Sequence, residues 1–134
     1  MDTLYRLPAN SIDCIVTSPM YYNDIDLGVS GAWGNERSVF EFLSKMRVFQ
    51  NELLRILKPR GTCFINISDS YAKKNHGSIK KGTKLLVPGF FSTQCILDGW
   101  ICENIIQWLK RNAFPTSAKS HLWDNLEPVF FMTK

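Results

Sequence analysis

The sequence predicts a single α/β domain, residues 1–134, with parallel strands packed against helices and an antiparallel strand pair at its C-terminal end. Two observations predict this class. A strand-like run at 14–17, a helical pattern at 38–57 and a strand-like run at 62–67 follow one another, and strands joined through a helix pair in parallel with a right-handed crossover. The strand-like stretches 100–109 and 128–133 have no helical pattern between them, so we expect them to pair antiparallel.

Composition places the chain among ordinary globular domains. Its 134 residues are enough for one domain with a buried core, and 45% are hydrophobic and 21% charged, which excludes a disordered chain. Its apolar runs are too short to cross a bilayer, so we expect a cytoplasmic protein with no membrane partner. The cysteines at 14, 63, 95 and 102 lack Cys-x-x-Cys spacing and are interpreted as buried free thiols. The two histidines lie far apart, so we expect no metal site.

The first strand leads into the stretch that we identify as the candidate site. Residues 14–17 are typical of a buried strand, which Ser18 and Pro19 end. Ligands of open α/β sheets bind at the carboxyl ends of the strands. Pro19 fixes its own φ and keeps Ser18 extended, which holds the Ser18 hydroxyl and nearby carbonyls as a stiff set of hydrogen-bond acceptors. Tyr21 or Tyr22 offers a flat face beside them, which favours a planar substrate that carries an amino group.

The helices are predicted from apolar periodicity and end signals. Residues 2–7 predict a single helical turn before the first strand. Residues 38–57 form the clearest helix, because apolar side chains recur three and four positions apart and Ser38 with Glu41 makes a capping box. A second amphipathic helix is expected at 85–97, with a proline in its first turn.

Two polar segments each have a structural and a functional interpretation. Residues 23–37 are either an ordinary connection or a mobile lid over the site, since they follow the first strand. Residues 73–84 are either a solvated flexible loop or a DNA-backbone contact, because lysines in a flexible segment neutralise phosphates without reading sequence. These lysines are Lys73, Lys74, Lys80, Lys81 and Lys84. The net charge of +4 is compatible with a nucleic-acid partner but is weak evidence for one.

Several motifs resemble those of one protein family, in the same order along the chain. Thr17-Ser18-Pro19-Met20-Tyr21-Tyr22 is similar to the Thr-Ser-Pro-Pro-Tyr-Tyr signature of the amino-group DNA methyltransferases, and the Ser form is typical of cytosine-N4 enzymes. Residues 57–72 resemble the family's Leu-Lys-Pro-x-Gly-Thr strand and Asn-Ile-Gly-Asp-Ser-Tyr-Ala loop. Residues 106–117 match its Ile-x-Trp-x-Lys-x-Asn-x-x-Pro-x-Ser pattern, and residues 127–134 match its Glu-x-x-x-x-x-Thr-Lys ending.

The resemblance covers the whole chain, and it implies a partial Rossmann-like S-adenosylmethionine methyltransferase fold. The implied cofactor is S-adenosylmethionine, and the implied partner is double-stranded DNA. The motifs imply a catalytic role for Ser18, Pro19 and Tyr21, and cofactor contacts for Asp2 and Ser18. For Asp2 a helix cap or a solvated acid is an equal alternative. The base-binding residues that the motifs imply are Tyr22, Asn112, Pro115 and Ser117.

The sequence also departs from the family pattern. It contains no Phe-x-Gly-x-Gly, the family's cofactor-binding loop, so we expect the cofactor-binding half to be absent and this chain alone to bind S-adenosylmethionine weakly. Met20 stands where the family has its second Pro, and Lys119 only approximates the family's Arg. We therefore expect a fragment or split subunit of a cytosine-N4 enzyme. The alternatives are a non-catalytic remnant that binds nucleic acid or a partner chain, and an adenine-N6 enzyme.

The position of the first strand also predicts association. Without the other half of the sheet, the apolar strand at 13–17 would lie at an edge. A long apolar edge strand is a template for pairing with another chain. We therefore expect a homo-oligomer or a complementary methyltransferase chain as partner.

Overall fold

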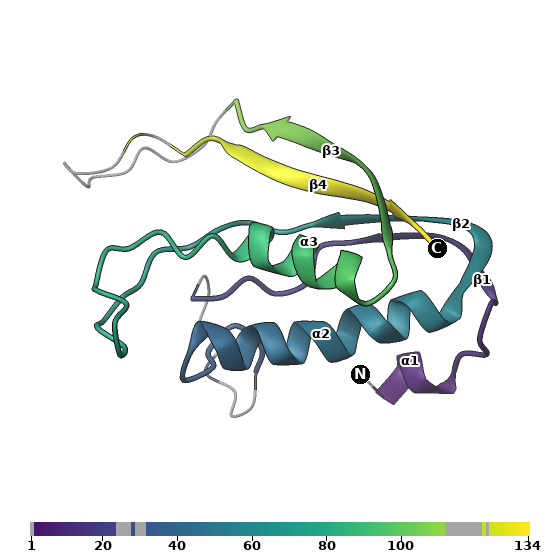
Figure 1. Cartoon of the computed structure of the whole chain (residues 1–134), viewed down its shortest axis with the longest axis horizontal. Helices are drawn as coiled ribbons and strands as arrows, with labels where there is room; N and C mark the ends of the chain where they lie inside the picture. Colours follow the sequence, from purple (N-terminus) through teal and green to yellow (C-terminus); the bar gives the residue numbers. More distant parts are fainter. Residues whose placement is uncertain (1, 24–27, 29–31, 112–121, 123) are drawn as a thin grey trace.

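A four-stranded sheet in the order β1-β2-β4-β3 lies at the centre of the computed structural model (Figure 1). The structure describes residues 2–23, 28, 32–111, 122 and 124–134. β1 (Ile12–Thr17) pairs in parallel with β2 (Leu57–Asn66), and β4 (Leu126–Thr133) pairs antiparallel with both β2 and β3 (Ile101–Leu109). The predicted parallel pair, the predicted antiparallel pair and the edge position of β1 are confirmed.

The helices lie together on one side of this sheet (Figure 1). They are α1 (Asp2–Arg6), α2 (Val39–Ile56) and α3 (Val87–Leu97). The predicted cap of α2 is present, because the Ser38 hydroxyl accepts a hydrogen bond from the Glu41 backbone N–H at 3.2 Å. The Glu41 carboxylate, however, accepts from the Arg37 N–H at 3.2 Å and not from the cap residue itself. Within the described residues, no helix is both long enough and apolar enough to span a membrane.

The connection from α2 to β2 is direct, so β2 begins earlier than the predicted run 62–67. Leu57 is already paired with β1, opposite Ile12. Gly61 allows the two strands to come close: a Cβ there would lie 2.7 Å from the Leu57 Cδ1 and 3.0 Å from the Asp13 carbonyl oxygen. The Leu57 side chain could move away from such a Cβ, whereas the Asp13 backbone would have to shift by a few tenths of an ångström.

The core fills the space between the helices and the face of the sheet that they cover, here called the inner face. Strand residues of the inner face alternate along the chain, as a strand with one covered face requires. They are Cys63, Ile65, Phe130 and Met132, each at most 2% exposed. α2 covers them with Phe42, Met46, Leu53 and Ile56. α3 buries Val87, Phe91 and Cys95 but exposes Phe90 and Leu97, so the prediction of an amphipathic helix is wrong: it is apolar on both sides.

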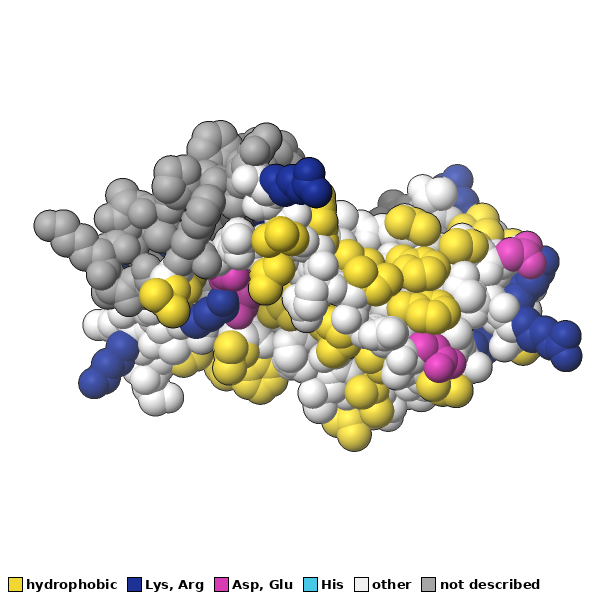
Figure 2. All heavy atoms as spheres, turned by 90° about the horizontal axis from the view of Figure 1, so that it is seen from above, with side chains coloured by type: hydrophobic (Ala, Val, Ile, Leu, Met, Phe, Trp, Pro, Cys, Tyr) yellow, Lys and Arg dark blue, Asp and Glu magenta, His cyan; other side chains and the backbone are white. Residues whose placement is uncertain are grey.

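The opposite face of the sheet, here called the outer face, has no helix over it in the described structure. The strand registers place Cys14, Val16, Phe64, Phe131, Val129, Ile106 and Trp108 on it. Val16 is 78% exposed and Cys14 is also exposed, so the predictions of a buried first strand and of a buried Cys14 thiol are wrong. Seen from the side on which β3 and β4 lie in Figure 1, hydrophobic side chains form much of the surface (Figure 2).

Residues 70–85, here called the hairpin, carry backbone hydrogen bonds that the sequence analysis did not predict. The Ala72 N–H donates to the Thr83 carbonyl at 2.9 Å, and His76 and Ile79 exchange backbone hydrogen bonds at 2.9 and 3.0 Å. The tip is a two-residue turn that needs a positive φ at its first position, where Gly77 has a φ of 56°. In Figure 1 this segment projects past the starts of α2 and α3.

Candidate active site

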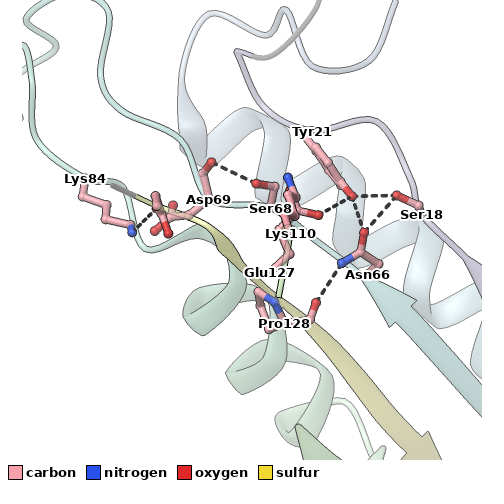
Figure 3. Close-up of polar contacts among 10 residues, drawn as sticks. Ser18, Tyr21, Asn66, Ser68, Asp69, Lys84, Lys110, Glu127 and Pro128 are labelled. Carbon is pink, nitrogen blue, oxygen red and sulfur yellow. Dashed lines mark hydrogen bonds and ion pairs between the residues drawn. The ribbon is translucent and has the colours of Figure 1, made fainter. Parts of the chain in front are cut away.

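The carboxyl ends of β1 and β2 meet at a small cluster of polar side chains (Figure 3). Ser18, directly after β1, lies with its Oγ 2.7 Å from the Tyr21 hydroxyl. The Tyr21 hydroxyl donates to the Asn66 Oδ1 at 2.5 Å, and Asn66 is the last residue of β2. The Ser18 Oγ is also 3.5 Å from the same Asn66 oxygen. The parallel pairing therefore brings together side chains that are 48 positions apart.

A fixed amide sets the direction of the hydrogen bonds in this cluster. The Asn66 Nδ2 donates to the Pro128 carbonyl at 3.1 Å, which turns the Oδ1 towards Tyr21. Because the Tyr21 hydroxyl gives its proton to this Oδ1, its oxygen can accept the Ser18 hydroxyl proton. In this arrangement the Ser18 proton points into the cluster and the Ser18 lone pairs are available to a substrate. This arrangement is compatible with the acceptor role of Ser18, which stays a prediction.

A half-buried ion pair borders the cluster on the side of β3 and β4. Glu127, at the start of β4, is 4% exposed and forms an ion pair with Lys110, just after β3. The second oxygen of the Glu127 carboxylate lies 3.5 Å from the Tyr21 hydroxyl (Figure 3). The ends of all four strands thus contribute to one polar site.

Three members of this site were not among the sequence-based candidates: Asn66, Lys110 and Glu127. All three belong to the motifs that carry the family resemblance, but no role was inferred for them. Asn66 is the first residue of the Asn-Ile-Gly-Asp-Ser-Tyr-Ala match and also continues the strand-like run Phe64-Ile65-Asn66-Ile67. A polar residue at the carboxyl end of the second parallel strand was the available signal.

The other predicted site residues are placed less directly. Tyr22 is buried, and its ring centroid is 5.5 Å from that of Phe42. Burial, more than the nearby Glu36 carboxylate, raises the pKa of Tyr22, so its hydroxyl stays protonated. Asp2 begins α1, and its side chain lies outside the described part of the chain. Asn112, Pro115 and Ser117 also lie outside the described residues, so their base-binding role stays a prediction.

An apolar hollow of about 260 Å³ lies beside Pro19. Its lining consists of Leu4, Thr17, Pro19, Met20, Trp33 and Phe49. These side chains suit a flat ring such as adenine, but only Thr17 among them is polar. A charged group of a cofactor would find no partner among these six residues.

The hairpin lysines divide into two groups. Lys73, Lys74, Lys80 and Lys81 are exposed. Lys84 instead forms an ion pair with Asp124, and its ammonium nitrogen lies 5.8 Å from the centre of the Tyr71 ring. The first four are therefore better placed for a new anionic partner than Lys84.

Neither cysteine chemistry nor a metal centre is built into the described site. Burial raises the pKa of Cys63 to about 12 and raises that of Cys95 as well, so both thiols are protonated at neutral pH and are poor nucleophiles. Among the described residues, no three His, Cys, Asp or Glu side chains lie close enough together to hold a metal ion. The cluster is suited to hydrogen bonding and positioning.

Comparison with known proteins gives consistent matches. A family model described as DNA methylase matches residues 12–134. The type II methyltransferase M.MwoI of Methanothermobacter wolfeii is 36% identical over 128 residues, which are 96% of this chain and 19% of that protein. M.Cfr9I of Citrobacter freundii is 30% identical and is matched over 100% of this chain and 52% of its own length. The chain thus spans about half or less of the length of these relatives.

Solved structures share the fold. TTHA0409 of Thermus thermophilus, solved in complex with S-adenosyl-L-methionine, superimposes with a TM-score of 0.73 at 22% identity. The match covers 99% of this chain and 49% of that one. The PvuII DNA methyltransferase, named as cytosine-N4-specific, gives a TM-score of 0.71 at 18% identity over 97% of this chain and 45% of its own.

Proposed function

We propose, since this chain belongs to the DNA methylase family, that it supplies the target-base half of a cytosine-N4 DNA methyltransferase. The observation that carries the proposal is the Ser18–Tyr21–Asn66 cluster at the carboxyl ends of β1 and β2. The cytosine-N4 choice rests on Ser18 in the motif and on the name of the PvuII relative. The double-stranded DNA substrate and S-adenosylmethionine follow from the same family membership.

The chemistry of the target explains why such a cluster is useful. The N4 amine of cytosine is a weak nucleophile because its lone pair is delocalised into the ring, and the base must leave the duplex to be reached. The Ser18 Oγ and the Pro19 carbonyl accept hydrogen bonds from the two amine hydrogens. This favours a pyramidal nitrogen with a localised lone pair. The contribution of the chain is positioning and electrostatics.

The other residues of the cluster hold Ser18 in the accepting orientation. Tyr21 accepts the hydrogen bond of the Ser18 hydroxyl and donates its own to Asn66, whose amide is fixed by Pro128. The Tyr21 ring, held at its hydroxyl, gives a face for the flipped base. S-adenosylmethionine would supply an electrophilic methyl group. As the nitrogen–carbon bond forms, the methyl–sulfur bond would break and leave its electron pair on sulfur. The amine nitrogen would then lose its extra proton to water.

A complementary polypeptide segment is part of the proposal. The hollow beside Pro19 offers apolar surface to an adenine ring but no charged partner, so the remaining cofactor contacts must come from elsewhere. Within the described structure β1 pairs only with β2, which leaves its second backbone edge for another strand. We infer that the partner continues the sheet at β1 and covers the outer face.

Methyl transfer by the reassembled enzyme tests the function. The chain is combined with a complementary segment that contains Phe-x-Gly-x-Gly, and tritiated methyl incorporation into duplex DNA is measured, with the product base identified by mass spectrometry. Ser18→Ala should remove most of the activity and leave DNA affinity nearly intact. Ser44→Ala, an exposed serine on α2, is the matched control. Full activity of Ser18→Ala, or label on cytosine C5, would contradict the mechanism.

Two tyrosine variants separate the roles of the ring and the hydroxyl. Tyr21→Phe keeps the ring and loses the hydrogen bonds, so it should lower the methylation rate without weakening DNA binding. Tyr21→Ala should weaken both, because a stacking contact is worth about 1–3 kcal/mol per base. Met20→Pro should raise activity if the departure from the family motif is a defect.

The alternatives are outcomes of the same assay. Label on adenine N6 would identify the adenine-N6 variant of the enzyme. An assembled complex that binds DNA but methylates no base would identify a non-catalytic remnant. The observation that favours this alternative is Met20 in place of the second Pro of the family motif.

A further inference from the structure

A second hollow, of about 390 Å³, lies between the start of α2 and the hairpin. The hollow is separate from the Ser18 cluster, but consecutive residues belong to the two: Tyr21 is part of the cluster, and Tyr22 lines the hollow. Its floor is apolar and buried, and consists of Tyr22, Val39, Ala72 and Leu85. Its rim carries Arg37, Lys73, Lys74 and His76, all exposed.

The charge of the rim is positive. Among the described lining residues, the only carboxylate is that of Glu36, whose side chain is fully buried. One of its oxygens pairs with the Lys45 ammonium at 3.0 Å, and the other accepts from the Gly34 N–H at 2.9 Å. The nearby Glu41 accepts from the backbone N–H of Arg37. The lysines and the arginine of the rim are thus balanced only in part by the carboxylates around them.

Both walls of the hollow are held in place. The hairpin wall is fixed by its own backbone hydrogen bonds and by the bond from the Leu85 N–H to the Ser70 carbonyl at 2.9 Å. The opposite wall is fixed where the Asn23 N–H donates to the Gly34 carbonyl at 2.8 Å and where Glu36 is buried. A site with a preformed shape loses less entropy when a ligand binds.

We propose that this hollow is a second nucleotide site, which binds the phosphodiester and sugar-base unit of a DNA strand next to the target nucleotide. The apolar floor with Tyr22 suits a sugar or base face, and the cationic rim suits a phosphate. Arg37 is the principal anchor, since guanidinium groups bind phosphate oxygens in pairs, with Lys73 and Lys74 on the facing wall. The assignment rests on the proposed function for the identity of the strand.

The test measures DNA binding by the 134-residue chain itself. A fluorescein-labelled single-stranded oligonucleotide is titrated at several salt concentrations, and the slope of log K against log salt is determined. Arg37→Ala should weaken binding and reduce the slope by about 0.7, the value for one phosphate contact on a single strand. Arg60→Ala is the matched control. Arg60 is exposed in the N-terminal half of β2, whereas the hairpin follows the carboxyl end of that strand, so this variant should leave the slope unchanged. Equal slopes for the two variants, or no binding by the wild-type chain at low salt, would overturn the site.

A variant that fills the hollow without changing the charge distinguishes binding in the hollow from non-specific attraction of DNA to a basic surface. Ile79 is half-buried in the hairpin and lines the hollow. Ile79→Trp should weaken oligonucleotide binding while circular dichroism stays that of the wild type. Wild-type affinity in a folded Ile79→Trp variant would contradict the proposal.

A mononucleotide competitor separates a DNA strand from a free nucleotide as the source of the phosphate. A deoxynucleoside monophosphate should compete only at concentrations far above those of the oligonucleotide, and equal competition would overturn the strand assignment. The two proposals fail separately. If the reassembled enzyme transfers no methyl group but Arg37→Ala still lowers the salt slope of oligonucleotide binding, only the proposed enzymatic function is rejected. If methyl transfer occurs and Arg37→Ala does not weaken it at low DNA concentration, only this nucleotide site is rejected.

Discussion

The two faces of the sheet carry similar side chains in very different surroundings. On the inner face Ile65 and Phe130 are at most 2% exposed beneath α2 and α3. On the outer face Val16 is 78% exposed and Trp108 is 53% exposed. Phe64 and Phe131 stack on each other there, with ring centroids 4.8 Å apart and planes at 6°. Composition alone does not distinguish the two faces.

The difference in exposure indicates that the two faces have different roles: one stabilises the chain itself, and the other is a contact surface for another segment. Parallel strands are normally covered on both faces, and their sequences are apolar on both for that reason. A contiguous exposed apolar surface of this kind marks an interaction site. The inner face therefore carries the stability of the chain itself, and we interpret the outer face as the surface for the proposed complementary segment.

Two adjacent phenylalanines provide the sharpest test of this comparison and the largest expected effect. Phe130→Ala, on the inner face, should cost about 3–5 kcal/mol in the free energy of unfolding, because it leaves a cavity in a packed core. Phe131→Ala, on the outer face, should cost about 0.5–1.5 kcal/mol, the value of an aromatic pair. Urea denaturation of the isolated chain measures both. Equal losses would mean that the outer face is as important as the inner one to the stability of the chain.

A buried hydrogen-bond network on the helix side gives the next effect. Gln50 is fully buried in α2, accepts from the Trp100 Nε1 at 2.5 Å and donates to Asp98 at 2.6 Å. Gln50→Ala should cost about 1–3 kcal/mol, because it leaves the buried Trp100 N–H without its partner. Gln107→Ala, at an exposed position of β3, should change stability by less than about 0.5 kcal/mol. A similar melting curve for both variants would show that the network contributes nothing.

The sequence predicted the architecture because local patterns determine it. The apolar periodicity of residues 38–57 predicts a helix, and the strand-like runs at 14–17 and 62–67 lie on either side of it. Two parallel strands joined through a helix have a right-handed crossover connection. The extent of β2 was missed, since Pro59 and Gly61 indicate a loop, yet the close approach at Gly61 lets the strand begin at Leu57. The hairpin was missed because lysines dominate 73–84, although Gly77 followed by Ser78 is a turn signal.

The site was predictable only as far as strand ends could be aligned. Ser18 and Tyr21 were identified from the motif, and the parallel pair places Asn66 beside them. The ion pair of Lys110 with Glu127 depends on the antiparallel register of β3 with β4, which pairs Trp108 with Glu127. No local pattern gives that register, so a role for these two residues could not be inferred from the sequence.

The exposed edge predicts a change in association and little change in stability. Val16→Lys places a charge on the outer face of an edge strand, which blocks pairing with another chain. Its unfolding free energy should stay within about 0.5 kcal/mol of the wild type. Sedimentation at increasing concentration should show self-association of the wild-type chain and less of it in the variant. A wild-type chain that is sharply monomeric at high concentration would contradict the association prediction.

The smallest expected effect concerns the ion pair that joins the helices on the inner side. Arg47 in α2 donates two hydrogen bonds to Asp98, just after α3, at 2.7 and 2.9 Å. The Arg47 side chain lowers the pKa of Asp98 below its usual value, and burial opposes this only in part. A carboxyl whose folded pKa is lowered adds stability above its unfolded pKa of about 3.9, and this stability is lost as the pH falls through the folded pKa.

Arg47→Ala should therefore raise the pKa of Asp98 towards about 3.9 and move the midpoint of acid unfolding upward by less than about one pH unit. The shift is small because the Arg47 side chain is 55% exposed, so water and salt screen the pair. Nuclear magnetic resonance titration of the Asp98 carboxyl and acid denaturation monitored by circular dichroism measure the two quantities, with Arg60→Ala as the control. The difference should shrink in about 1 M salt, where charges are screened within a few ångströms. An Asp98 pKa that stays low in Arg47→Ala would assign its stabilisation to the hydrogen bonds from Gln50 and Gln94, which also lower it.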